Sequence, residues 1–132
     1  TDYSIVWNYA NERGITDNGF EWALTKDGTV VVMGYSGETT TIVIPEIING
    51  YPVTEIAGRA LYSNSTLRNV YIGNNITTIG NAAFRGSNTI FYVEHESLPI
   101  GWNQAWCNAT TVYWNVSDVA KRTGFQTVKF MI

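Results

Sequence analysis

The sequence predicts a β-dominated solenoid, in which short repeat units stack and contribute their strands to a parallel sheet. Three observations support this fold class. Apolar positions recur after 23 residues, 14% of the residues are aromatic, and Asp27-Gly28 between two β-rich runs is a hairpin signal. Because one repeat unit cannot cover its own apolar face, the units must pack on one another and the ends of the stack need caps.

The composition limits the classes of partner. The 132 residues fit one domain, and 45% of them are hydrophobic while 14% are charged, which excludes a disordered chain. The net charge is −3 and no basic run occurs, so we expect no nucleic-acid partner. No apolar stretch approaches the roughly 18–20 residues that cross a membrane, so we expect no membrane insertion by this chain.

The repeat lies in residues 53–72 and 76–95. When the first segment is shifted by 23 positions, its apolar residues align with apolar residues of the second. The aligned pairs include Val53 with Ile76, Ile56 with Ile79, Leu61 with Phe84, Leu67 with Ile90 and Val70 with Val93. We expect residues 67–72 and 90–95 to form ladder strands, and residues 56–61 and 79–84 to form irregular or short helical return segments. The same shift places His95 on Ile72, so His95 is expected to be a structural residue at the edge of the core.

Weaker copies extend the repeat. Residues 41–45 resemble an earlier ladder strand and residues 111–114 a later one, giving about four in all. Residues 20–25 and 29–35 form the expected capping hairpin. We therefore divide the chain into an N-terminal segment with that hairpin (1–40), a repeat region (41–116), and a C-terminal cap or the start of a further domain (117–132). The 23-residue period of the repeat region lies in the range of roughly 20–29 residues expected for leucine-rich repeats.

The repeat units VTEIAGRALYSNSTLRNVYI and ITTIGNAAFRGSNTIFYV resemble the BspA-type (treponemal) leucine-rich repeat, V-T-x-I-G-x-x-A-F followed by a polar turn and L-x-x-V-x-I-P. Gly80 and Phe84 match this pattern, whereas Ala57, Leu61 and Gly73 stand where Gly, Phe and Pro are usual. The resemblance covers roughly residues 20–115. It implies an α/β-type leucine-rich repeat solenoid and a secreted or surface-anchored bacterial protein, some of whose relatives adhere to host proteins.

No catalytic or metal-binding constellation is visible. His95 is the single histidine, and strand alternation would turn it away from Glu94 and Glu96. Cys107 matches no nucleophile signature and is expected to be a buried thiol. No phosphate-binding loop or zinc motif occurs. We therefore expect no enzyme activity, no metal ion and no cofactor.

The alternation of side chains along a strand predicts which of them point outward from the ladder strands. The candidate binding residues are Val43, Asn69, Tyr71, Tyr92, Glu94 and Tyr113. Tyrosines supply large contact areas at low entropic cost, but the same rings could instead pack across strands to stabilise the sheet. The five tryptophans are expected in the core and caps, with a carbohydrate-stacking platform as the alternative.

Two functions from different classes follow. The first is an extracellular or cell-surface interaction module of adhesion type, which binds a host or microbial protein through its sheet face. The second is a spacer or capping module without a ligand, and a carbohydrate-binding module is a further alternative. The chain begins at Thr1 and ends in an apolar run, so we expect a mature or excised piece of a longer protein.

Overall fold

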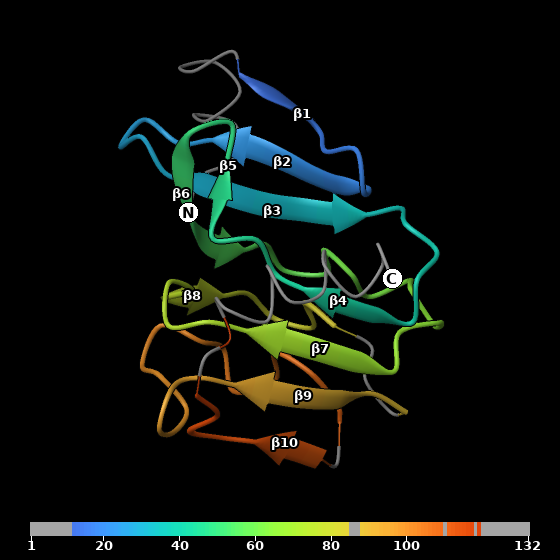
Figure 1. The fold of residues 1–132 in the computed structure, drawn as a ribbon. Helices are drawn as coiled ribbons and strands as arrows, with labels where there is room; N and C mark the ends of the chain where they lie inside the picture. Colours follow the sequence, from blue (N-terminus) through green and yellow to red (C-terminus); the bar gives the residue numbers. More distant parts are fainter. Residues whose placement is uncertain (1–11, 85–87, 110, 118, 120–132) are drawn as a thin grey trace.

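The computed structural model describes residues 12–84, 88–109, 111–117 and 119 (Figure 1). The first eleven residues of the expected N-terminal segment, and nearly all of the expected C-terminal segment 117–132, lie outside this part. The described chain forms ten strands: β1 (Arg13–Ile15), β2 (Phe20–Leu24), β3 (Val30–Tyr35), β4 (Thr41–Val43), β5 (Ile47–Ile48), β6 (Tyr51–Ile56), β7 (Asn69–Ile72), β8 (Thr78–Ile79), β9 (Ile90–Val93) and β10 (Thr111–Tyr113). They belong to two sheets, which we call the ladder sheet and the return sheet.

The ladder sheet has the order β10-β9-β7-β4 and is parallel throughout. Its inward positions hold Ile42, Val70 and Phe91, all of which are buried, because alternate side chains of a strand point to opposite faces. The expected parallel ladder is therefore confirmed. In Figure 1 its strands run from β4 beside the N-terminal strands to β10 at the far end of the stack.

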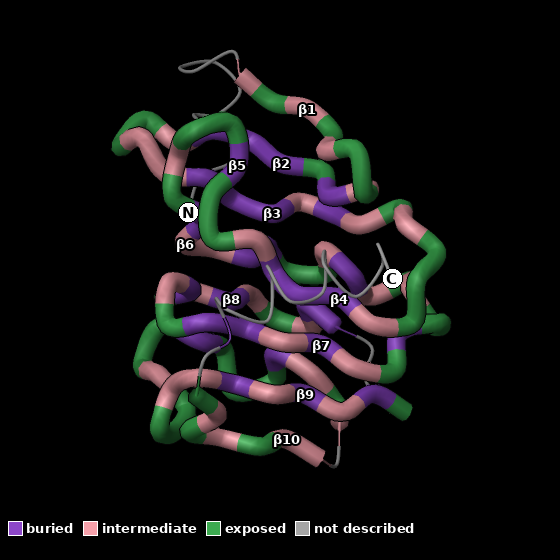
Figure 2. The backbone as a smooth tube through the Cα atoms, in the orientation of Figure 1, coloured by how far each residue is buried: buried purple, intermediate pink, exposed green. Residues whose placement is uncertain are grey.

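The return sheet has the order β1-β2-β3-β6-β5, with β8 also paired to β6. Strands β2 and β3 form the expected antiparallel hairpin around Gly28, whose φ of 80° suits the turn. Strand β3 then pairs in parallel with β6, so the hairpin continues the return sheet at one end of the solenoid. Its apolar residues join the core, as the buried segments in Figure 2 show.

The return segments are short strands and irregular turns, not short helices. Ile56 pairs with Ile79, and Ile79 pairs with Trp102, always at an offset of 23 residues. Backbone bonds run between successive units, from Gly80 N to Ile56 O at 3.0 Å and from Asn103 N to Ile79 O at 2.8 Å. Each unit thus satisfies the backbone groups of the next one, as a helix would otherwise do internally.

The ladder sheet does not follow the 23-residue shift. Tyr71 pairs with Tyr92, and Ile72 with Val93, so the offset between β7 and β9 is 21. The alignments of Ile72 with His95, of Val70 with Val93 and of Leu67 with Ile90 were therefore wrong. The physical reason lies in the turn, because Ile90 follows Phe84 after two fewer residues than separate Asn69 from Leu61.

An aromatic cluster closes the core towards β10. The rings of Phe84, Phe91 and Trp106 contact one another edge to face, with centroids 4.9–6.0 Å apart. Trp102 and Trp106 lie 5.0 Å apart, and half-buried Trp114 packs against both. With Trp22 also buried, the expected core and cap positions hold for the four tryptophans within the described residues; Trp7 lies outside them.

Candidate functional site

Three tyrosines form a continuous row on the outer face of the ladder sheet. Tyr71, Tyr92 and Tyr113 occupy the same position of β7, β9 and β10, and we call them the tyrosine row. The first two rings stack with centroids 4.4 Å apart and 12° between planes. The next pair lies 5.6 Å apart at 29°. Tyr71 and Tyr92 are half-buried, and Tyr113, on the edge strand, is 52% exposed.

A polar row runs beside the tyrosine row and is bonded to it. The Tyr92 hydroxyl donates to Asn69 Oδ1 at 3.1 Å, and Asn69 Nδ2 donates to Thr41 Oγ1 at 3.3 Å. The remaining members of this row are Thr111 and one apolar residue, Ile90, both half-buried. Ile90 was missed because the 23-residue shift placed it on the core position of Leu67, whereas the pairing of Tyr71 with Tyr92 places it on the outer face. Thr111 was not identified, although strand alternation puts it on the same face as Tyr113.

Two candidate residues differ from their expected setting. Val43 takes the row position next to Tyr71 but is only 7% exposed, so it offers little contact area. It lies where the first ladder strand meets the N-terminal cap, beside Pro45 and Ile48 in the lining of a groove. Glu94 follows the end of β9, and its Oε1 accepts a bond from Asn74 N at 2.9 Å. Glu94 thus holds the turn after β7.

His95 has a structural setting, and Cys107, which was expected to be buried, is half-buried. His95 Nε2 donates to Ile76 O at 2.9 Å, and its ring meets Trp102 edge to face. Burial raises the pKa of the Cys107 thiol, and a backbone hydrogen bond at Ala109 opposes that effect in part. Within the described residues, no group of three or more His, Cys, Asp or Glu side chains comes together as a metal ion would require.

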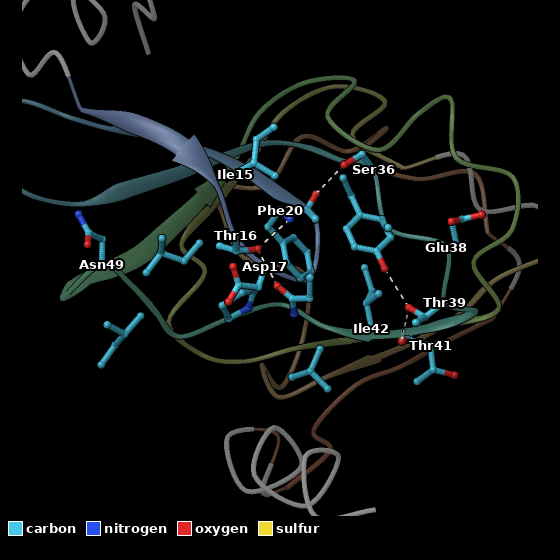
Figure 3. Close-up of a pocket in the computed structure, with 18 residues that line it drawn as sticks. Ile15, Thr16, Asp17, Phe20, Ser36, Glu38, Thr39, Thr41, Ile42 and Asn49 are labelled. Carbon is cyan, nitrogen blue, oxygen red and sulfur yellow. Dashed lines mark hydrogen bonds between the residues drawn. The ribbon is translucent and has the colours of Figure 1, made fainter. Parts of the chain in front are cut away.

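A groove separates the N-terminal hairpin from the first ladder strand (Figure 3). Its volume is about 840 Å³. The walls come from the turn between β1 and β2, the loop between β3 and β4, and strands β4 and β5. The sequence does not predict this groove, because it forms where separate turns and strands within residues 15–49 meet in space.

No protein-family model matches the chain, and no curated protein matches it either. Among the helices of the described residues, none has the length and apolarity needed to cross a membrane.

Three solved structures share the fold. A leucine-rich cell surface protein from Faecalibacterium prausnitzii is 22% identical (TM-score 0.59), over 78% of this chain and 32% of that one. A leucine-rich repeat protein from T. pallidum is 29% identical (TM-score 0.55), over 68% of this chain and 42% of that one. A leucine-rich repeat protein from Bacteroides capillosus is 21% identical (TM-score 0.58), over 78% of this chain and 99% of that one.

This chain thus spans about a third of the Faecalibacterium protein and 42% of the T. pallidum protein. The chain has the leucine-rich repeat solenoid fold of these bacterial proteins.

Proposed function

We propose that the chain is an extracellular protein-interaction module of adhesion type, built from BspA-type repeats, without enzyme activity of its own. The observation that carries this proposal is the tyrosine row beside the polar row on one face of the ladder sheet. A partner would meet tyrosine edges and hydroxyls, together with Asn69 and Thr111. The Faecalibacterium protein, described as a cell surface protein, supports the location.

The stacking geometry favours a protein partner over a sugar. Carbohydrate recognition by aromatic residues uses an open ring face. Tyr71 and Tyr92 direct ring faces at each other, and Tyr92 also stacks on Tyr113. Polar ring edges and hydroxyl groups suit the mixed apolar and hydrogen-bonding contacts of protein interfaces.

The same stacking also supports the alternative, a spacer without a ligand, because ring contacts across strands stabilise a sheet. The two functions separate in a binding experiment with a panel of purified extracellular host proteins on sensor surfaces. The variant Tyr113→Ser/Thr111→Ala changes the outer edge of both rows and leaves the Tyr71–Tyr92 stack in place. Ile100→Ser, at a fully exposed position outside the ladder sheet, is the matched control.

We expect at least one panel member to bind the native chain and the control alike, and to bind the ladder variant about tenfold more weakly. The Ile100→Ser control should unfold at nearly the native urea concentration, and the ladder variant at a somewhat lower one, because it loses the Tyr92–Tyr113 stack. If no panel member binds, the spacer function is supported instead, and if both variants bind as the native chain does, the tyrosine row is not the binding surface. Binding to a glycan array that the ladder variant abolishes would favour the carbohydrate alternative.

A further inference from the structure

The groove between the N-terminal hairpin and β4 combines two carboxylates with two exposed apolar side chains. Asp17 comes from the turn between β1 and β2, and Glu38 from the loop between β3 and β4 (Figure 3). Neither Lys, Arg nor His is present in the lining. Within the part of the chain that the structure describes, neither carboxylate has an ion pair or a hydrogen bond. Among the described residues, the lining of the groove is therefore negatively charged.

The apolar walls come from the two edges of the return sheet. Ile15 in β1 is 64% exposed and Ile47 in β5 is 63% exposed, and both line the groove. Among the described strands β1 pairs only with β2, and β5 only with β6. Within the described residues, the outer edges of β1 and β5 thus have no paired strand, and addition of a strand at such an edge is how extended peptides commonly bind to sheets.

Hydrogen bonds hold the groove in shape without a ligand. Thr16 Oγ1 accepts from Phe20 N at 2.9 Å and closes the turn that carries Asp17. The Tyr35 hydroxyl and Thr39 Oγ1 lie 2.8 Å apart, and Thr39 Oγ1 donates to Thr41 O at 3.1 Å. Figure 3 shows these bonds along the loop that carries Glu38. The entropic cost of ordering these loops when a ligand binds is therefore small.

From this geometry we propose that the groove binds an extended basic peptide segment of a partner protein. Its Lys or Arg side chains meet Asp17 and Glu38, and its apolar side chains pack on Ile15 and Ile47. This site is separate from the tyrosine row and does not depend on the function proposed for it.

Fluorescence anisotropy with a labelled probe tests the proposal. The probe is a seven-residue peptide of alternating valine and lysine, blocked at both ends, and its comparison peptide has glutamate in place of lysine. We expect the lysine peptide to bind the native chain and the glutamate peptide not to bind. Asp17→Asn/Glu38→Gln should weaken binding about tenfold, and raising the salt concentration should weaken it too.

Asp27→Asn/Glu96→Gln is the matched control, because it removes the same charge at exposed positions outside the groove. It should bind within twofold of the native chain, and so should Tyr113→Ser/Thr111→Ala, which separates this site from the ladder face. Ile47→Ser should weaken binding through the apolar wall. No binding by the lysine peptide at millimolar concentration, equal binding of both peptides, or equal losses in the groove and control variants would overturn the proposal.

Discussion

The rings of Tyr71 and Tyr92 stack almost in parallel, 4.4 Å apart, although the residues are 21 positions apart in a chain whose return segments pair 23 positions apart. The stack exists because the turn that leads to β9 is two residues shorter than the turn that leads to β7. A sequence repeat with one period has thus produced a structure with two offsets. The ladder offset determines which side chains form the outer face.

The Tyr71–Tyr92 stack should appear as an energetic coupling. We expect Tyr71→Leu and Tyr92→Leu to destabilise the fold separately, and the double variant to lose less than their sum by about 0.5–1.5 kcal/mol, since stacked aromatic pairs contribute about that much beyond buried area. Urea unfolding of the four proteins measures the coupling. Additive losses would mean that the rings are neighbours without mutual stabilisation.

Gly80 should not tolerate a side chain. A Cβ at this position would lie 2.4 Å from Gly58 N and 2.7 Å from its Cα, both backbone atoms of the preceding unit. Gly80→Ala should therefore cost about 1–3 kcal/mol, because successive return segments must move apart. Gly28→Ala is the comparison, since its Cβ meets nothing within 4 Å and only the positive φ opposes it. A smaller loss at Gly80 than at Gly28 would contradict the close approach.

Ala82 should respond in the opposite sense. Its φ is 54°, a left-handed conformation that is unfavourable for alanine, and Arg59 adopts the same conformation one unit earlier. Ala82→Gly should raise the free energy of unfolding by up to about 1 kcal/mol, because the relieved strain exceeds the entropy that glycine adds to the unfolded chain. Ala83→Gly, next to it in the buried core, should instead destabilise. Thermal unfolding distinguishes the two signs.

Trp102 and His95 share one acceptor. Trp102 Nε1 donates to Ile76 O at 3.1 Å, and His95 Nε2 donates to the same oxygen at 2.9 Å. With either Trp102→Phe or His95→Phe, one donor remains, whereas the double variant removes both. The double variant should therefore lose about 1–2 kcal/mol more than the sum of the single losses. Purely additive values from denaturant unfolding would show that the carbonyl finds another donor.

Cys107 should react slowly with alkylating reagents. Desolvation raises the pKa of its thiol, so at a given pH less of the reactive thiolate is present than in the unfolded chain. The alkylation rate of the native protein should rise with pH and reach half its maximum at a higher pH than the rate measured in urea. Mass spectrometry follows both reactions. A half-maximum at the same pH in both states would contradict the effect of burial.

The sequence by itself determined the fold class, because the apolar spacing of a solenoid is local and recurs within each unit. Asp27-Gly28 likewise marked the β2–β3 hairpin, and alternation placed Tyr71, Tyr92 and Tyr113 on the outer face. These features depend on short-range geometry that a single strand or turn already possesses.

Only the tertiary structure decided the register and the surroundings of each site. Because the turn before β9 is shorter, Ile90 lies on the outer face and not at the core position that the 23-residue shift predicted. No pattern within the strand itself contains this information. The burial of Val43 and the groove lined by Asp17 and Glu38 both arise where the hairpin meets the first ladder strand. Such surroundings depend on contacts between distant segments, and the physical reason is that packing between units, not strand periodicity, fixes how those segments meet.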